Sequence, residues 1–241
     1  MIQYSFAQEI DEKDYDLIIN CPIYQQWLKE SLEKFKVTEV YFASVDYFAK
    51  EHKPLFIKLR ATATLPDGRP VHGIVVVRGH AVGVLVVLWC LGKPYLLLVR
   101  QPRLAISETD SLEIPAGILD WSNDFRKVAL SELKEEAQIL AQEDELIDLM
   151  DFWYGNFTKG FAGSCGLLDE RIRLYAIERQ VTPEQLKVMD GKSQTYTDEI
   201  EWIKTEVLPY EEASHQFIDG KNLIAMFLYE RWLKSQGRKL P

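Results

Sequence analysis

The hydrophobic and polar positions between residues 56 and 89 are typical of β-strands. Ile57 and Leu59 alternate with charged residues, and the stretch "PDGRP" at 66–70 then has the composition of a tight reversal. Two valine-rich runs follow, separated by Arg78 and Gly79. The pattern predicts a strand, a turn and two further strands.

Three other segments have hydrophobic residues at helical spacing. The first covers residues 24–35, with apolar positions Tyr24, Trp27, Leu28, Leu32 and Phe35. The second begins near residues 122–124, which are good N-caps, ends at about residue 141, and has apolar positions Phe125, Val128, Ala129, Leu133, Ala137 and Leu140. The third covers residues 219–237, with apolar positions Leu223, Ile224, Phe227, Leu228 and Trp232.

The remaining regular segments are predicted strands, at residues 39–49, 93–103, 152–157, 171–179 and 199–208. After the N-terminal part, the order is therefore strands, one helix, strands, one helix. This order is typical of an α+β fold in which helices pack on a sheet.

Composition narrows the class of protein. Hydrophobic residues make up 47% of the 241 residues, which is enough for a packed core. The net charge of -9 disfavours a nucleic-acid-binding protein, because phosphate contacts need clustered Lys and Arg. The longest apolar run, "AVGVLVVLWCLG" from Ala81, is too short to span a membrane, and no targeting segment is visible, so we expect a cytoplasmic protein, with an organelle as the alternative. Cys21, Cys90 and Cys165 have neither disulfide nor zinc spacing.

The predicted helix that ends near residue 141 gathers carboxylates. Glu132 and Glu136 lie four residues apart with Glu135 beside them, so the three side chains project from neighbouring turns. Like charges at this spacing destabilise a helix by roughly a few tenths of a kcal/mol per pair, and a divalent cation reverses that cost. Oxygen ligands alone suit Mg²⁺ or Mn²⁺. A solvated acidic face is the alternative explanation.

The same stretch resembles the signature of the Nudix hydrolases, G-x5-E-x7-R-E-U-x-E-E-x-G-U, where U is a bulky aliphatic residue. The positions in register are Gly117, Glu132, Leu133, Glu135, Glu136 and Ile139. Three positions depart from the signature: Asn123 replaces the first Glu, Ser131 the Arg, and Gln138 the second Gly. Segments in order from "QWLKESLEKF" to "DGKNLIAMFLYE" further resemble plant-type ADP-sugar pyrophosphatases of this superfamily.

The resemblance implies a Nudix fold, which is a mixed β-sheet between helices in an α/β/α sandwich, with an N-terminal β-rich extension. Residues 1–78 are then the N-terminal helix and antiparallel strands, and residues 79–241 the hydrolase domain. It also implies a homodimer, because the N-terminal strands of this family commonly reach the partner's active site.

The resemblance also assigns roles. It implies Mg²⁺ or Mn²⁺ held by Glu132 and Glu136 and by the carbonyl of Ala116, with assistance from Glu135. The catalytic base would be Glu201, with Glu199 as its neighbour on the same strand face. The candidates for substrate binding are Arg78, Arg103, Glu113 and Glu170. Arg100 is a weaker candidate, and the aromatic candidates for a nucleobase platform are Tyr41, Phe42, Tyr47, Phe48 and Trp121.

The function that the resemblance implies is hydrolysis of the pyrophosphate bond of a nucleoside diphosphate sugar, ADP-ribose or ADP-glucose, to a nucleoside monophosphate and a sugar phosphate. A UDP-sugar pyrophosphatase is one alternative. A second is a non-catalytic nucleotide-binding module, which the departures Ser131 and Gln138 would suit. A third is an unrelated α+β protein whose acidic helix docks a protein partner.

Overall fold

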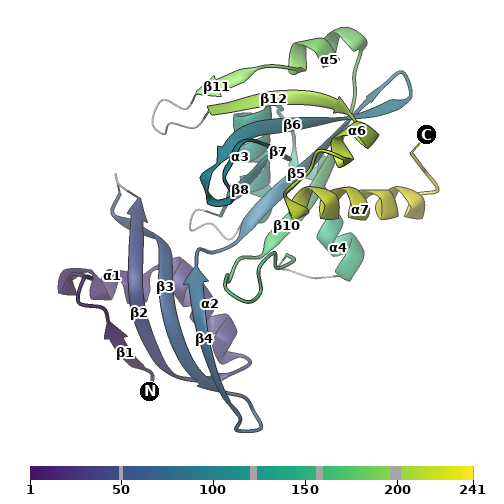
Figure 1. Ribbon diagram of the computed structural model, residues 1–241. Helices are drawn as coiled ribbons and strands as arrows, with labels where there is room; N and C mark the ends of the chain where they lie inside the picture. The colour runs from purple at the N-terminus through teal and green to yellow at the C-terminus, as the bar shows by residue number, and fades with distance from the viewer. Residues whose placement is uncertain (49–50, 120–123, 156–159, 196–201, 241) are drawn as a thin grey trace. The chain divides into compact units, whose positions relative to one another are not determined.

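The computed structural model describes residues 1–48, 51–119, 124–155, 160–195 and 202–240. These residues form two compact units (Figure 1). The first unit contains Met1–His80 and Ala162–Arg171, and the second contains Ala81–Phe161 and Ile172–Pro241. That two domains meet between residues 78 and 79 stays a prediction.

The first unit is built on a four-stranded sheet of order β1-β2-β3-β4. Its elements are β1 (Gln3–Phe6), α1 (Tyr15–Asn20), α2 (Pro22–Leu32), β2 (Lys36–Phe48), β3 (Lys53–Thr64) and β4 (Pro70–Val77). Strand β1 runs parallel to β2, and the other pairs are antiparallel. The reversal predicted at 66–70 lies between β3 and β4, where Gly68 has a φ of 87° that suits glycine.

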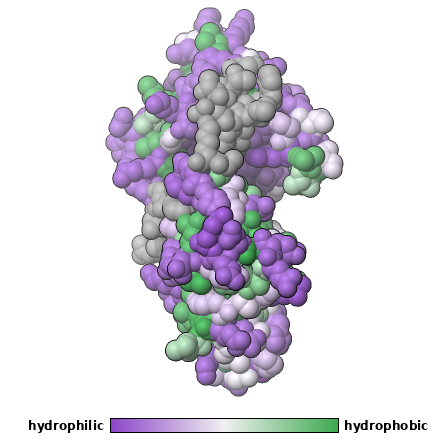
Figure 2. All heavy atoms as spheres, turned by 90° about the vertical axis from the view of Figure 1, so that its left-hand side faces the viewer, coloured by the Kyte–Doolittle hydropathy of each residue, from purple (hydrophilic) through white to green (hydrophobic). Residues whose placement is uncertain are grey.

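Aromatic side chains dominate the core of this unit. Phe42 is fully buried and lies against Phe6, Tyr4 and Tyr24, with a ring centroid distance of 4.8 Å to Phe6. Leu168 of the returning segment forms a parallel bridge with Val76 of β4. On the side of the unit that Figure 2 shows, hydrophobic and hydrophilic residues are interspersed.

The second unit is a mixed eight-stranded sheet with helices on both faces (Figure 1). Its strands are β5 (Ala81–Cys90), β6 (Lys93–Arg103), β7 (Glu108–Glu113), β8 (Ala116–Ile118), β9 (Ile147–Asp148), β10 (Ile172–Gln180), β11 (Ser193–Thr195) and β12 (Trp202–Pro209). Its helices are α3 (Phe125–Ala137), α4 (Leu149–Tyr154), α5 (Pro183–Met189), α6 (Tyr210–Ser214) and α7 (Gly220–Ser235). The main path runs β11-β12-β6-β5-β10-β9, while β7 pairs with β6 and β8 with β5.

Strand β5 lies at the centre of this sheet and is buried on both faces. Leu85 and Val87 pack with α4, α6 and α7 on one face, whereas Val84 and Val86 pack with α3 and α5 on the other. A strand buried on both faces has a continuous hydrophobic sequence instead of an alternating one, which explains the valine-rich run. The layers confirm the predicted α/β/α sandwich.

Several sequence-based expectations were wrong in detail. Residues 152–154 lie in α4, not in a strand, because Asp148 caps this helix by accepting the N–H groups of Met150 and Asp151. The helix expected to end near residue 141 ends at Ala137. Helices α5 and α6 were not expected. In α7, Leu228 is buried as expected, but Leu223 and Phe227 are exposed. The other buried positions of this helix include Asn222, Ala225, Met226, Tyr229 and Leu233.

Candidate active site

Helix α3 carries the glutamates of the candidate site. It begins after Asp124, whose side chain accepts the N–H of Lys127 at 3.2 Å, as one of the three proposed N-caps. Ala129, Leu133 and Ala137 are buried against the sheet. Because residues three and four apart share a helix face, this packing fixes how the glutamates between them are directed.

Two of these glutamates meet the same turn of the backbone. Glu136 is buried, and its Oε2 accepts the N–H of Ala116 at 2.9 Å. Glu132 reaches the next residue, since an ideal Cβ built on Gly117 would lie 1.9 Å from Glu132 Oε1. The two carboxylates therefore converge on the Ala116–Gly117 segment, where the carbonyl of Ala116 is the third oxygen of the predicted set.

Glu135 points elsewhere. Its side chain is exposed, and Oε1 accepts a hydrogen bond of 2.6 Å from the hydroxyl of Ser131, the residue that replaces the signature Arg. Within the described residues, no three Asp, Glu, His or Cys side chains form a cluster that could hold a metal ion. Carboxylate and carbonyl oxygens at one turn nevertheless fit a hard divalent cation such as Mg²⁺, which binds through one or two carboxylates and keeps several waters.

The third departure from the signature has a visible conformational consequence. Gln138 takes the place of a glycine and adopts the left-handed conformation, with a φ of 55°. It ends α3, and the N–H of Ile139 closes the turn by donating to the Leu133 carbonyl at 2.9 Å. Lys192 Nζ donates to the Gln138 side chain at 3.2 Å. The helix end is therefore kept although the glycine is lost.

Glu113 lies at the end of β7 in a buried ion-pair network. It is 1% exposed, and its two oxygens accept hydrogen bonds from Nε and Nη2 of Arg103 at 2.7 and 2.9 Å. Lys221 Nζ donates to Glu113 Oε2 at 2.5 Å and to Asp219 at 2.6 Å. Burial by itself would raise the pKa of Glu113, but the hydrogen bonds from Arg103 and the charge of Lys221 outweigh it and lower that pKa to about 2.

Lys221 and Asn222 were not among the residues predicted from the sequence. Both lie in the first turn of α7, and both are buried. Two consecutive polar residues in the first turn of a helix are a weak signal, because N-terminal turns are often solvated. Apart from Asp219, their partners are more than a hundred residues away, at Leu112, Glu113 and Ile114.

Two further polar groups were missed in the same neighbourhood. Gln101 Nε2 and Ser111 Oγ are buried and have no hydrogen-bond partner in the part of the chain that the structure describes. The two residues are directly opposite each other in the β6–β7 pair, as are Val99 and Glu113. Opposite residues of an antiparallel pair share a sheet face, so Gln101 and Ser111 lie on the same face as Glu113.

The other pair of substrate-binding candidates belongs to the first unit. Arg78 Nη1 lies 3.2 Å from Glu170 Oε1, and its guanidinium lies 5.5 Å from the centroid of the Phe56 ring. The neighbouring Asp169 accepts the backbone N–H groups of Arg78 and Gly79 at 2.8 and 3.3 Å. Burial raises the pKa of Asp169 to about 6, even though these hydrogen bonds oppose the shift.

The remaining candidates are placed as follows. Arg100 is ion-paired with Glu206 and Asp110. Phe42 is core, and the Tyr47 ring stacks on His52 at 4.4 Å while its hydroxyl donates to Asp14. Glu199, Glu201, Trp121 and Asn123 lie outside the described residues.

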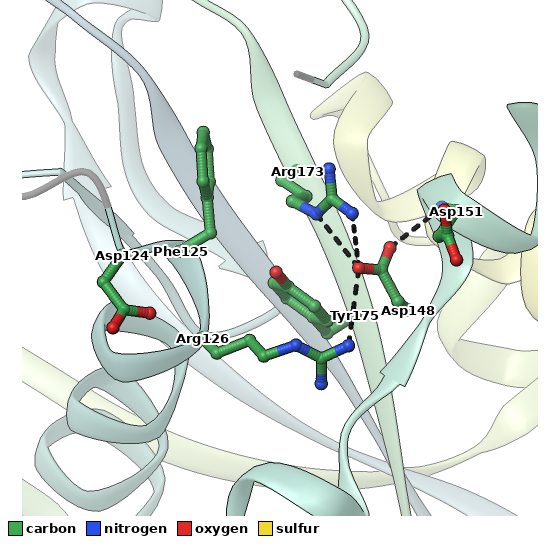
Figure 3. Close-up of a pocket in the computed structure, with 7 residues that line it drawn as sticks. All are labelled: Asp124, Phe125, Arg126, Asp148, Asp151, Arg173 and Tyr175. Carbon is green, nitrogen blue, oxygen red and sulfur yellow. Dashed lines mark hydrogen bonds and ion pairs between the residues drawn. The ribbon is translucent and has the colours of Figure 1, made fainter. Parts of the chain in front are cut away.

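An open pocket of about 620 Å³ lies elsewhere in the second unit (Figure 3). Arg126 and Arg173 both point to Asp148, and the Arg126 guanidinium lies 5.6 Å from the Tyr175 ring centroid. Phe125 and Arg126 precede Glu132 by about 10 Å along the helix. Three aspartates and two arginines line the pocket, so its charge is net negative and disfavours a diphosphate.

Comparison with known proteins decides the family. The NUDIX domain family matches residues 78–222. The chain belongs to the Nudix family. Nudix hydrolase 14, chloroplastic, from Arabidopsis thaliana is 30% identical over 232 residues, which cover 92% of this chain and 74% of that protein. A methanol dehydrogenase activator from Bacillus methanolicus is 29% identical over 162 residues, or 67% of this chain and 78% of that protein.

The fold of this Nudix protein is also found among solved structures. The crystal structure of an ADP compounds hydrolase matches with a TM-score of 0.56 and 18% identity, over 85% of this chain and 97% of that one. Nudix membership supports hydrolase chemistry on nucleotide substrates, which in this family generally uses a divalent metal such as Mg²⁺. In the described part of the chain, no helix is both long and apolar enough to cross a membrane.

Proposed function

We propose that this Nudix protein hydrolyses the pyrophosphate bond of a nucleoside diphosphate sugar, ADP-ribose or ADP-glucose, in a Mg²⁺-dependent reaction. The observation that carries the proposal is the convergence of Glu132 and Glu136 on the Ala116–Gly117 turn. Such a cluster of oxygen donors provides a place for the charge of a diphosphate to be neutralised through a cation.

The metal would be held by Glu132, Glu136 and the Ala116 carbonyl, and when bound it would supply the positive charge that makes phosphorus open to attack. Arg103 interacts electrostatically with Glu136, one of the two converging glutamates, and its guanidinium suits phosphate oxygens. Its side chain is 40% exposed although Glu113 holds one of its edges. Arg103 would therefore bind and orient the diphosphate from the β6 side.

In the proposed reaction, the oxygen of a water molecule forms a bond to one phosphorus atom, and the bond from that phosphorus to the bridging oxygen breaks. The products are a nucleoside monophosphate and a sugar phosphate. Glu201, with Glu199 as the alternative, would take the proton of the attacking water. These assignments, together with Arg78, Glu113 and Glu170 as substrate-binding residues, are part of the proposal.

The substrate, assembly and compartment are proposals as well. An ADP-containing substrate is proposed because the structural relative is named an ADP compounds hydrolase. A homodimer follows from the family resemblance alone. The compartment would be the cytoplasm or an organelle, and the chloroplastic relative motivates the second alternative.

The experiment is to incubate the protein with ADP-ribose, ADP-glucose and UDP-glucose, in Mg²⁺ and in chelator. We expect cleavage of an ADP-sugar only with the metal, and a loss of at least about a hundredfold in kcat/KM for Glu132→Gln. Glu211→Gln changes an exposed glutamate of α6 and serves as the matched control.

The alternatives have distinct outcomes. Cleavage of UDP-glucose in preference to the ADP-sugars would change the substrate class. Binding without cleavage of any of the three would favour a non-catalytic module, to which the loss of the signature Arg at Ser131 points. Unchanged turnover of Glu132→Gln would show that the site lies elsewhere.

A further inference from the structure

The first turn of α7 holds β7 on both sides of Glu113. Asn222 is fully buried, its Oδ1 accepts the N–H of Ile114 at 3.0 Å, and its Nδ2 donates to the Leu112 carbonyl at 3.0 Å. These are the backbone groups that a neighbouring strand would otherwise satisfy. One side chain thus fixes the backbone before and after Glu113, and with it the direction of the Glu113 side chain.

Lys221 fixes the other end of that side chain. Its side chain is 8% exposed, and Nζ is shared between Glu113 Oε2 and Asp219 Oδ2. A carboxylate held by a lysine at one oxygen cannot rotate freely. Its two oxygens therefore stay in the plane that allows the double hydrogen bond to Arg103.

The pairing also has an electrostatic consequence. A buried glutamate facing only Arg103 would cancel the guanidinium charge, and the attraction for an anionic ligand would be lost. Lys221 takes up part of the Glu113 charge and is itself shared with the partly exposed Asp219, whose charge is more strongly screened by water. Arg103 is therefore more attractive to phosphate than it would be beside Glu113 alone. Hydrogen bonding to Glu113 raises the pKa of Arg103, and the charge of Glu136 on α3 adds to this shift.

We propose that Lys221 and Asn222 are positioning residues of the active site, which hold Glu113 and through it orient Arg103 for the phosphates of the substrate. The inference rests on the proposed function for its ligand. It adds a linkage between the C-terminal helix and the diphosphate site that the Nudix signature does not contain.

The first test is a double-mutant cycle on ligand affinity. The probe is α,β-methylene ADP-ribose, in which carbon replaces the bridging oxygen, with MgCl₂, and its Kd is measured by calorimetry. We expect Lys221→Met and Arg103→Ala each to raise Kd about tenfold, and the double variant to bind no more weakly than Arg103→Ala alone, because Lys221 acts through Arg103. Losses that multiply in the double variant, or wild-type affinity in Lys221→Met, would overturn the inference.

Two controls separate positioning from loss of folding. Lys234→Met makes the same change at an exposed position of α7 and should leave Kd unchanged. Lys221→Arg keeps a cation near Glu113 and should restore most of the affinity. A Kd of Lys221→Arg as weak as that of Lys221→Met, at an unchanged melting temperature, would contradict a role for the charge.

A second test does not depend on turnover or binding. The Nε–H of Arg103, paired with Glu113, should give a slowly exchanging side-chain NMR signal, which Arg103→Lys identifies by its loss. We expect the signal to broaden in Lys221→Met and in Asn222→Asp and to persist in Lys234→Met; persistence in all three would overturn the inference. If the wild type neither binds nor cleaves a nucleotide sugar, the proposed function fails, and this signal still decides whether Lys221 controls Arg103.

Discussion

Gly117 and Glu132 are in such close contact that no side chain fits between them. A Cβ at position 117 would lie 1.9 Å from Oε1 and 2.3 Å from the carboxyl carbon of Glu132. The backbone at Gly117 does not have a positive φ, so the glycine is needed for close approach and not for a special conformation. The first glycine of the signature and its central glutamate thus form one structural unit.

Gly117→Ala is therefore expected to move the Glu132 carboxylate away from the turn. Because the displaced atoms are the end of a flexible side chain, the free energy of unfolding should change by less than about 1 kcal/mol. We expect kcat/KM for ADP-ribose to fall at least about a hundredfold. Gly73→Ala, at a glycine with open space around it, is the control for the same chemical change. If Gly117→Ala kept the wild-type turnover, Glu132 would not be part of the active site.

Gln138→Gly should stabilise the protein. A non-glycine residue in the left-handed conformation costs about 1 kcal/mol, and Gln138 bears that cost at the end of α3 with a φ of 55°. Glycine relieves it but has more freedom in the unfolded chain, so we expect a net gain of up to about 1 kcal/mol in urea unfolding. A loss of stability would show that the contact between Lys192 and Gln138 outweighs the strain.

Asp169 should make stability depend on pH in the weakly acidic range. Its pKa is about 6 in the folded protein against an ordinary value of 3.8, so the folded state retains a proton that the unfolded state releases. This contribution is fully present below about pH 4 and is lost as the pH rises through about 6. We expect a loss on the order of 1–2 kcal/mol across this range.

The measurement that isolates Asp169 is the difference in unfolding free energy between wild type and Asp169→Asn, taken at about pH 4.5 and about pH 7.5, on either side of the folded pKa. Asparagine does not titrate, so the wild type should lose stability relative to the variant as the pH rises. A difference that is the same at both values would show that Asp169 is ionised normally in the folded state.

Ser111→Ala tests whether the buried hydroxyl is truly unpaired. An unsatisfied buried polar group is unfavourable, so its removal should be neutral or stabilising by up to about 1 kcal/mol. The comparison is Thr205→Val, because Thr205 is equally buried but donates to the Met189 carbonyl at 2.7 Å. That change should destabilise by about 1–3 kcal/mol. A similar loss for Ser111→Ala would mean that its hydroxyl binds a water or a ligand.

The glutamates of the proposed site could be picked out from the sequence because the pattern that singles them out is local. Glu132 and Glu136 are recognised by their spacing on one helix, and the central strand is recognised by its run of valines. Both patterns involve residues that are close together in the sequence. The N-cap of α3 at Asp124 and the layered sandwich are predicted by the same kind of local pattern.

The partners of Glu113 could not be predicted in this way. Lys221 and Asn222 contact it and its neighbours from a helix 108 residues further along the chain, and a lysine in a first helical turn gives no sign that it is buried. Helix α4 was missed because its local sequence favours a different structure from the one that it adopts. Its aromatic residues favour a strand by propensity, but the cap by Asp148 and packing of Trp153 against Phe227 override that preference.

The segment Ala162–Arg171 leaves the second unit and returns to it through adjoining residues. Phe161 and Ile172 exchange both backbone hydrogen bonds, at 3.1 and 2.9 Å, while Leu168 bridges to β4 of the first unit. If the chain were cut once at residue 80, the second unit would therefore keep this loop but lose β4, the strand with which Leu168 pairs. Because its two ends already meet, replacing it by a tight hairpin connection is the way to express the second unit as a separate fragment.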